Sequence, residues 1–232
     1  MKNNTKDIGL IGFKGFVGSA IYENLSNNYE VIGIDRNNYS ENKLKDFDII
    51  INSAMPSKRF WAKFNPDKDY EETVLKTKNI LKDFNFNKII HISSISARCQ
   101  LETTYGKNKK KSEQLVSKSK NYLIIRLGPM YGKNLDKGVL IDLINDRKVF
   151  CNSKSKYSFT NLDFITNWIS DNLKSKGIVE LGAQNYIEIN KLKTLINSKS
   201  TFEGDIDNQI IISKNNYNQD SYDVISFCKF LK

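Results

Sequence analysis

The chain has few of the side chains that hold metals and disulfides. It contains one histidine, His91, and three cysteines, Cys99, Cys151 and Cys228, which lie far apart in the sequence. Zinc sites and disulfide frameworks need such residues in closely spaced clusters. We therefore expect neither a disulfide framework nor a bound metal.

Long apolar runs are also absent. No stretch approaches the roughly 18 apolar residues of a membrane-spanning helix. The run at residues 8–11 is too short for the apolar core of a signal peptide. We therefore expect a cytoplasmic protein with no membrane partner.

Acidic side chains are outnumbered by basic ones, 26 against 36, which gives a net charge of +10. A basic surface suits nucleic acid or an anionic membrane. However, only five of the basic residues are arginine, the side chain that nucleic-acid interfaces favour for bidentate contacts. We therefore expect no nucleic-acid partner, and the charge also suits a small substrate that carries phosphate.

Continuous apolar runs alternate with helical stretches in the first part of the chain. Residues 66–84 carry apolar side chains at three- and four-residue steps, with Asn65 as the expected cap and Pro66 in the first turn. Apolar strands separated by helices predict a parallel sheet that is covered on both faces. We therefore expect an α/β fold with a doubly wound parallel sheet of the Rossmann type. The expected strands are residues 8–11, 31–34, 49–51, 89–92 and 123–127.

The pattern becomes less regular after Gly132. Helices are expected at residues 138–149, 164–173 and 189–196, and a strand at residues 178–181. We expect a dinucleotide-binding core over residues 1–132. A short α/β substrate-binding cap is expected over residues 133–232, with elements that return to the core.

A glycine-rich turn follows the first expected strand. Gly12, Gly15 and Gly18 fall at three-residue steps, and Phe16 and Val17 lie between the last two. Such a turn lets backbone N–H groups approach a pyrophosphate, and the following helix adds partial positive charge. We expect these five residues to bind a dinucleotide.

An acidic residue, Asp35, ends the second expected strand, about 20 residues after the glycines, as in dinucleotide-binding proteins. Its carboxylate would accept hydrogen bonds from the adenosine ribose and repel a 2′-phosphate, which favours NAD as the cofactor. The adjacent Arg36 could receive a 2′-phosphate instead, so NADP stays open as an alternative.

The Gly-x-x-Gly-x-x-Gly spacing resembles that of the short-chain dehydrogenase/reductase superfamily. It is most similar to the extended branch, the NAD-dependent epimerase/dehydratase family that acts on nucleotide-sugars. The superfamily's second mark is a Tyr-x-x-x-Lys pair, and two such pairs occur, Tyr39 with Lys43 and Tyr105 with Lys109. Only the second pair follows the fourth expected strand. There, residues 105–113 resemble the family's YGxSKxxxE helix start.

Further segments resemble family motifs in the family's order. The resemblance covers residues 7–197 and implies that Ser53, Ala54 and Gly128 lie beside the cofactor. The segments are residues 48–54 (third strand), 90–94 (fourth strand with the active-site hydroxyl), 126–132 (RPGNVYG), 158–163 (RDFVHVDD) and 177–182 (GVYNLG).

The resemblance implies a catalytic set of Ser94, Tyr105 and Lys109. Tyr105 and Lys109 share a helix face, so the ammonium is expected to lower the pKa of the phenol from about 10 toward neutrality. Tyr105 would take a proton from a sugar hydroxyl, at C4 by preference, while hydride passes to the cofactor, and would return it in the reverse direction. Lys109 would also bind the nicotinamide ribose, and Ser94 would donate to the carbonyl oxygen that forms.

Other side chains near the fourth strand leave alternatives open. Ser93 and Ser96 are rivals for the hydroxyl role, and His91 is expected to be structural. The Asp-Glu pair of the family's dehydratases is replaced by Ile95 and Ser96, so elimination of water through that pair is not expected. The asparagine that often contacts the nucleotide-sugar is replaced by Pro129.

The preferred function is therefore an NAD(P)-dependent sugar epimerase or reductase acting on a nucleotide-sugar. The alternative from another class is a non-catalytic dinucleotide-binding or sensing module on the same fold, which loss of Tyr105 or Lys109 would have marked. Both residues are present. A homodimer is left open, since this fold often pairs through the helix with the Tyr-Lys motif.

Overall fold

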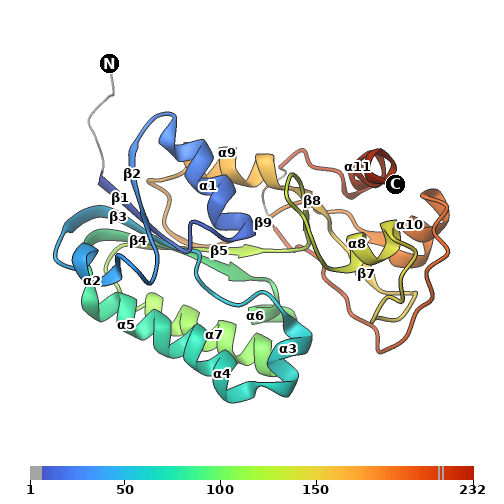
Figure 1. Cartoon of the computed structure of the whole chain (residues 1–232), viewed down its shortest axis with the longest axis horizontal. Coiled ribbons are helices and arrows are strands. Elements are labelled where there is room, and N and C mark those ends of the chain that lie inside the picture. Colours follow the sequence, from blue (N-terminus) through green and yellow to red (C-terminus); the bar gives the residue numbers. More distant parts are fainter. Residues whose placement is uncertain (1–6, 214, 216) are drawn as a thin grey trace. The chain divides into compact units, whose positions relative to one another are not determined.

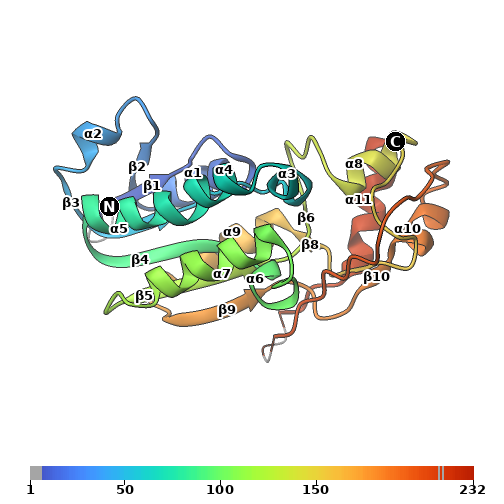
Figure 2. The same cartoon turned by 90° about the horizontal axis from the view of Figure 1, so that it is seen from below.

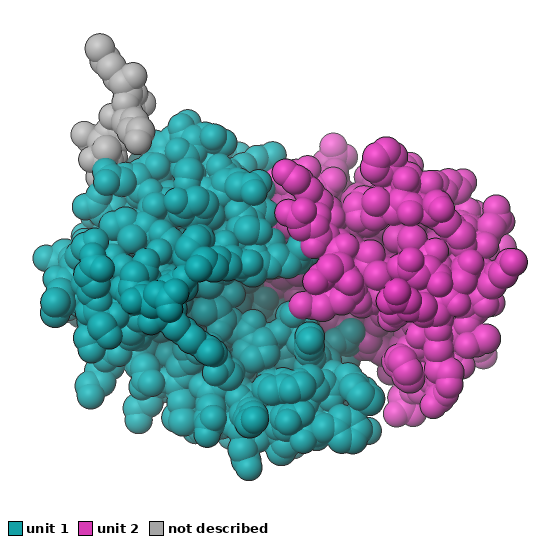
Figure 3. Space-filling model, in the orientation of Figure 1, with its two compact units in different colours: residues 1–126, 166–179 teal, residues 127–165, 180–232 magenta. Residues whose placement is uncertain are grey.

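The computed structural model describes residues 7–213, 215 and 217–232. The chain divides into two compact units, coloured separately in Figure 3. Unit 1 contains the chain up to residue 126 together with residues 166–179. Unit 2 contains residues 127–165 and 180–232.

A six-stranded sheet forms the centre of unit 1 (Figure 1). Its order, β2-β1-β3-β4-β5-β9, confirms the predicted doubly wound parallel sheet, with parallel pairing of β1 to β2 and β3 and of β3 to β4. The order reverses between β1 and β3, the place where such sheets bind ligands beyond the carboxyl ends of the strands. The strands are β1 (Asp7–Ile11), β2 (Glu30–Ile34), β3 (Asp46–Asn52), β4 (Asn85–Ser94), β5 (Tyr122–Leu127) and β9 (Gly177–Leu181).

The central strands are built from runs of isoleucine. Ile50 and Ile51 of β3 and Ile89 and Ile90 of β4 are fully buried. β-branched side chains suit a pleated strand, and a continuous apolar run suits a strand that is covered on both faces.

Helices cover both faces of the sheet (Figures 1 and 2). On one face lie α1 (Phe16–Ser26) and the unit 1 part of α9 (Leu162–Asp171). On the other face lie α5 (Lys76–Asp83) and α7 (Thr104–Val116), and the short α6 (Ser96–Cys99) packs against α7. Ile80 of α5 and Val116 of α7 belong to the buried cluster beneath them.

The single helix predicted for residues 66–84 is interrupted. The structure has α4 (Pro66–Tyr70), then a π-helical turn (Glu71–Leu75), then α5. A π-helical turn inserts an extra residue into the helix, and such turns are frequent at functional sites. Asn65 takes the predicted N-cap position and Pro66 begins α4, but the Asn65 side chain makes no capping hydrogen bond. It donates instead to the carbonyl of Trp61 (3.1 Å) in the preceding α3 (Arg59–Phe64). The remaining helix of unit 1 is α2 (Tyr39–Asn42).

Unit 2 is built from short elements around its own core. The core includes Leu143, Tyr157, Phe159 and Ile187. The strands are β6 (Met130–Tyr131), parallel to β8 (Thr160–Asn161), and β7 (Lys156–Tyr157), antiparallel to β10 (Ile187–Glu188). The helices are α8 (Val139–Ile144), α10 (Ile189–Leu195) and α11 (Val224–Leu231), the last preceded by a 3-10 turn (Ser221–Asp223).

Two features of unit 2 differ from the pattern of the sequence. The helix predicted for residues 138–149 ends at Ile144, and Asp146 then adopts a left-handed backbone (φ 55°) that ends helical structure. The polar segment after Ser198 is tied to the unit by backbone hydrogen bonds, such as Ser158 N to Gln209 O at 2.9 Å. Within the described ranges, the structure contains no helix with the length and apolar character needed to cross a membrane.

Candidate active site

The glycine turn brings the backbone of β1 against that of β3. Gly12 has φ +87°, and a Cβ added there would lie 2.8 Å from backbone atoms of Ser53 and Ala54. Only glycine tolerates both the left-handed backbone and this approach. The turn therefore places Gly12, Gly15, Ser53 and Ala54 together, and Phe16 begins α1 immediately after it. Val17 and Gly18 lie in the first turn of that helix, so its positive end faces this edge of the sheet.

A cavity of about 690 Å³ lies at the carboxyl ends of β1 and β2. This volume is in the range of small-molecule sites. Of the predicted cofactor residues, the cavity is lined by Gly12, Gly15, Asp35, Arg36 and Ala54. It is also lined by Lys14, Tyr39, Glu72 and Lys76, among others, which the sequence reasoning did not select.

Both carboxylate oxygens of Asp35 have partners at this cavity. Its Oδ1 accepts a hydrogen bond from the backbone N–H of Asn37 at 2.8 Å, and its Oδ2 is paired with the Lys14 ammonium. The hydrogen bond from Lys14, followed by that from Asn37, lowers the pKa of Asp35, so the carboxylate is charged at neutral pH. Lys14 lies inside the glycine motif, and its position there was the signal that could have identified it.

Arg36 and Lys76 share one acidic partner across the same cavity. Arg36 Nη2 lies 3.4 Å from Glu72, and Lys76 pairs with the same carboxylate. Lys76 also donates to the carbonyl of Ala54 at 3.2 Å. The cavity therefore carries three cations, Lys14 included, each beside a carboxylate. The four-residue spacing of Glu72 and Lys76 on one helix was the sequence signal for their pairing.

A second cluster forms where β4 ends and α7 begins. Thr103 caps α7 by accepting a hydrogen bond from Gly106 N at 3.0 Å. Gly106 is needed because a Cβ there would lie 2.1 Å from the carbonyl oxygen of Gln100. This close packing of α6 on α7 positions Tyr105 in the first turn and Lys109 one turn later, both buried.

The three predicted catalytic side chains lie together. Tyr105 is hydrogen-bonded to the Ser94 side chain, and Lys109 Nζ lies 5.0 Å from the centroid of the Tyr105 ring. The rival hydroxyls donate away from Tyr105: Ser93 donates to Glu113 at 2.8 Å, and Ser96 donates to Gln100 at 2.8 Å while it accepts from Ser94 at 3.3 Å. Of the three hydroxyls, the geometry therefore favours Ser94.

The electrostatics of this cluster differ from the expected ones. Burial raises the pKa of Tyr105 to about 12, and it outweighs Arg59 and Ser94, which both lower that pKa. Burial also lowers the pKa of Lys109 to about 7, although Asp69 and Glu113 act in the opposite direction. The predicted lowering of the phenol pKa is thus wrong for the chain alone, because desolvation of the phenolate is larger than the stabilisation from neighbouring cations.

A buried ion pair anchors α7 to the sheet. Glu113 accepts two hydrogen bonds from the Arg126 guanidinium, at 2.9 and 2.7 Å, in addition to the one from Ser93. This pairing ties α7 to the ends of β4 and β5, where Ser94 must be held against Tyr105.

His91 takes a structural position. It is fully buried, with Asn52 Nδ2 3.3 Å from Nδ1 and Ser112 Oγ 3.1 Å from Nε2. Burial, and to a smaller extent the charge of Lys109, lowers the pKa of His91 to about 3. The imidazole is therefore neutral at ordinary pH.

Sequence reasoning missed one buried acid in this cluster. Asp69 of α4 is fully buried, and its Oδ2 accepts a hydrogen bond from Asn108 Nδ2 at 2.8 Å. A charged residue on the inner face of the amphipathic helix was the available signal.

Gly128, the remaining residue predicted to lie beside the cofactor, lies in unit 2, where Ile211 packs against it.

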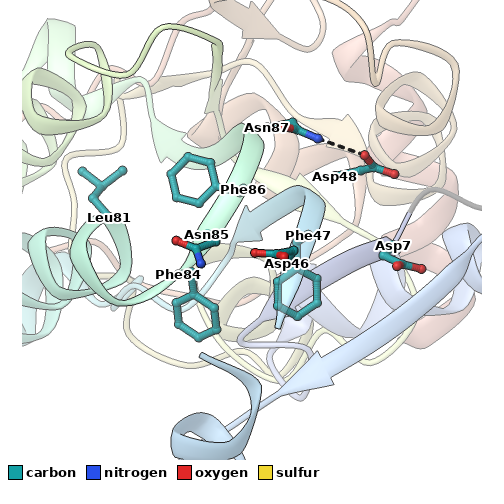
Figure 4. Close-up of a pocket in the computed structure, with 9 residues that line it drawn as sticks. All are labelled: Asp7, Asp46, Phe47, Asp48, Leu81, Phe84, Asn85, Phe86 and Asn87. Carbon is teal, nitrogen blue, oxygen red and sulfur yellow. Dashed lines mark hydrogen bonds between the residues drawn. The ribbon is translucent and has the colours of Figure 1, made fainter. Parts of the chain in front are cut away.

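A second hollow, of about 630 Å³, lies at the amino ends of the strands (Figure 4). It is lined by Asp7, Asp46 and Asp48 and by three phenylalanines, and Asn87 donates to Asp48 at 3.1 Å. Across the part of the chain that the structure describes, no three His, Cys, Asp or Glu residues are arranged to hold a metal ion.

Solved structures of low sequence identity share this fold. UDP-N-acetylglucosamine 4-epimerase from Methanobrevibacter ruminantium M1, in complex with UDP-N-acetylmuramic acid, is 17% identical with a TM-score of 0.78, over 99% of this chain and 97% of that one. The dTDP-4-dehydrorhamnose reductase of Bacillus anthracis str. Ames, in complex with NADP, is 17% identical with a TM-score of 0.77, over 98% and 100%. The Bordetella bronchiseptica enzyme WbmG, in complex with NAD, is 13% identical with a TM-score of 0.75, over 91% and 86%.

A search of the curated proteins finds no significant match. The sequence profile of the NAD dependent epimerase/dehydratase family, in contrast, matches residues 8–148, which include the glycine turn, Asp35 and the cluster of Ser94, Tyr105 and Lys109. The chain therefore belongs to the NAD dependent epimerase/dehydratase family.

Proposed function

We propose that the chain is an NAD(P)-dependent epimerase or reductase that moves hydride at a sugar carbon of a nucleotide-sugar, by preference C4. The observation that carries this proposal is the contact of half-buried Ser94 with buried Tyr105, and of Tyr105 with buried Lys109, at the same sheet edge as the glycine turn. Family membership supports the reaction class.

The cavity fits a nicotinamide dinucleotide. A Cβ at Gly12 would collide with the backbone of Ala54, so glycine at this position lets a pyrophosphate come close to the backbone of the turn. The Asp35 carboxylate, which also lines the cavity, can accept hydrogen bonds from ribose hydroxyls. When bound, such a cofactor supplies a hydride acceptor and donor. Lys109 would bind its nicotinamide ribose.

The chain's own residues handle the proton. Tyr105 takes the proton of the hydroxyl as the C–H bond of the same carbon gives up its hydride, and a carbonyl forms. Ser94 donates a hydrogen bond to that oxygen. A positive charge near the phenol, like that of Arg59, acts to lower the pKa of Tyr105. A cationic nicotinamide would act in the same direction against the effect of burial.

For the cofactor we propose NAD, with NADP as an alternative. The charged Asp35 favours NAD because it repels a 2′-phosphate. Lys14 neutralises part of that charge, and Arg36 stands beside it at the cavity. Among the similar structures, one holds NAD and another NADP.

For the substrate we propose a nucleotide-linked sugar. Two of the similar proteins are described with UDP- or dTDP-sugars, and the net charge of +10 suits a diphosphate. Ile95 and Ser96 in place of an Asp-Glu pair make a dehydratase the less suitable choice.

One observation favours a second candidate, a dinucleotide-binding module without catalysis. With its pKa raised to about 12, Tyr105 of the free chain stays protonated at neutral pH and is a weak base. In such a module the cofactor would bind and no sugar would turn over.

Turnover of a panel of UDP-, dTDP-, GDP- and CDP-sugars with NAD and NADP separates the two candidates. We expect one class of sugar to react, and Tyr105→Phe to lower kcat by about 10²- to 10⁴-fold while cofactor affinity is retained. Tyr39→Phe is the matched control, since Tyr39 lines the cavity but bonds Asp83. Full turnover by Tyr105→Phe would remove the catalytic assignment, and cofactor binding with no turnover of any sugar would favour the module.

A further inference from the structure

The most unusual group near the catalytic cluster is the carboxylate of Asp69. It lies on α4 with no solvent exposure, directly before the π-helical turn. Buried carboxylates are costly unless hydrogen bonds or an opposite charge stabilise them. The Asp69 carboxylate therefore needs a hydrogen-bond donor or a cation to offset the cost of its burial.

Only half of this carboxylate is satisfied by a hydrogen bond. Oδ2 accepts from Asn108 Nδ2 at 2.8 Å, whereas Oδ1 is buried and has no hydrogen-bond partner among the residues that the structure describes. Thr73, one turn later on the same helical segment, likewise has a buried Oγ1 with no described partner. Unsatisfied buried oxygens of this kind are rare in native proteins and often mark functional sites.

The charge that faces Asp69 is the ammonium of Lys109. Asn108 and Lys109 lie in the same turn of α7, so the hydrogen bond from Asn108 ties Asp69 of α4 to the turn that carries Lys109. Burial raises the pKa of Asp69, while the Asn108 hydrogen bond and then the charge of Lys109 act to lower it. Burial lowers the pKa of Lys109 to about 7, while the charge of Asp69 acts to raise it.

The other ionisable groups around Lys109 are bonded elsewhere, carry the same positive charge as Lys109, or are neutral. Glu113 of α7 also attracts the ammonium, but Arg126 occupies both of its oxygens. Lys76 of α5 repels it. His91 of β4 is neutral at ordinary pH, as its lowered pKa of about 3 shows. Asp69 is thus the carboxylate whose charge is available to Lys109.

We propose that Asp69 is a positioning residue of the site: its buried carboxylate, tied to α7 by Asn108, holds the Lys109 side chain in place beside Tyr105. The inference rests on the proposed function for its catalytic meaning, because Lys109 must be charged to bind the nicotinamide ribose and to assist Tyr105. The pairing of charges itself can be measured without any sugar substrate.

The test is the pH dependence of unfolding. Lys109 has a pKa of about 7 in the folded chain and 10.5 as its ordinary value. Between these values the unfolded chain binds a proton that the folded chain has released, so the stability contribution of Lys109 rises with pH from about 7 upward. Removal of the Asp69 charge lowers the pKa of Lys109 further. His91 adds its own rise between about pH 3 and 6.5, so the contribution of Lys109 is read as the difference from the same chain with Lys109→Met. In Asp69→Asn this contribution should begin to rise at lower pH, by about one unit.

Asp67→Asn is the matched control, since Asp67 is exposed on the same helix and the change in charge is equal. It should leave the onset where it is in the wild type. Lys109→Met should remove the rise above pH 7, and adding Asp69→Asn to it should then cause no further change in the profile above pH 7. If Asp69→Asn does not fold, Asn108→Ser tests the same contact and should move the onset in the same direction by less.

Cofactor affinity gives the second measurement. Fluorescence titration with NADH at pH 7.5 should show about tenfold weaker binding to Asp69→Asn than to Asp67→Asn, a change that corresponds to about 1.4 kcal/mol. An unshifted onset in Asp69→Asn, or a shift that persists when Lys109 is replaced by Met, overturns the inference. Failure of every sugar to react, with the onset shifted, would instead reject the proposed function and leave the charge pairing intact.

Discussion

The two edges of the sheet in unit 1 carry hollows of similar size and opposite character. At the carboxyl edge, a cavity of about 690 Å³ holds a glycine turn, the start of α1 and cations beside carboxylates. At the amino edge, a hollow of about 630 Å³ is lined by three aspartates and three phenylalanines. The volume therefore does not distinguish them, whereas the backbone and the charge do.

The difference follows from the direction of the strands. In a parallel sheet with helices between strands, helix N-termini lie at the carboxyl edge, and their partial positive charge attracts anions. Aspartates at the other edge repel a phosphate. The comparison predicts that changes at the carboxyl edge alter cofactor binding and anchoring, and that matched changes at the amino edge do not.

The largest effect is expected at the buried ion pair behind the carboxyl edge. Glu113→Gln leaves the Arg126 guanidinium buried beside a neutral partner and should lower the free energy of unfolding by about 3–5 kcal/mol. Asp48→Asn at the amino edge, whose partner is Asn87, should change it by less than about 0.5 kcal/mol. Urea unfolding monitored by circular dichroism measures both. Equal losses in the two variants would contradict the comparison.

A smaller effect is expected from alanine in the glycine turn. Gly12→Ala combines a left-handed backbone with a Cβ 2.8 Å from the backbone of Ala54, and should cost about 1–3 kcal/mol and abolish tight NADH binding. Gly177→Ala is the matched control at the start of β9, because its φ of +89° gives the same backbone strain with nothing within 4 Å. Calorimetric titration with NADH should detect normal affinity for that control. If both variants bind NADH normally, the turn is not the pyrophosphate site.

The smallest effect concerns cofactor choice. Asp35→Asn removes the charge that repels a 2′-phosphate and leaves Lys14 and Arg36 at the cavity, so the affinity for NADPH relative to NADH should rise about tenfold. Asp46→Asn makes the same substitution at the amino edge and should leave the ratio unchanged. The ratio is obtained from fluorescence titrations with both cofactors. If the wild type already binds NADPH more tightly than NADH, Asp35 does not select against the 2′-phosphate.

The sequence predicted the sheet because its central strands are unbroken apolar runs. It underestimated β4, which begins at Asn85 rather than at residue 89, because the first residues of that strand are partly polar. It also could not reveal the π-helical turn, since one inserted residue leaves apolar side chains at three- and four-residue steps. Local periodicity thus predicts the type of an element better than its continuity.

For the candidate site, the sequence predicted the residue types and their order along the chain. It missed the pairing of Lys14 with Asp35 and the burial of Asp69, because both depend on contacts between segments far apart in sequence. The direction of the Tyr105 pKa was wrong for the same reason: spacing places a lysine near the phenol, but only the fold determines how far both are desolvated.

The buried position of His91 makes neutral-pH titrations of this protein easier to interpret. The chain has a single histidine, and with a pKa of about 3 its imidazole does not change charge between pH 5 and pH 9. Imidazole usually dominates protonation near pH 7 in proteins, whereas here burial lowers the pKa of the Lys109 amine to about 7. In the folded chain, a titration signal in that range therefore contains no contribution from this imidazole.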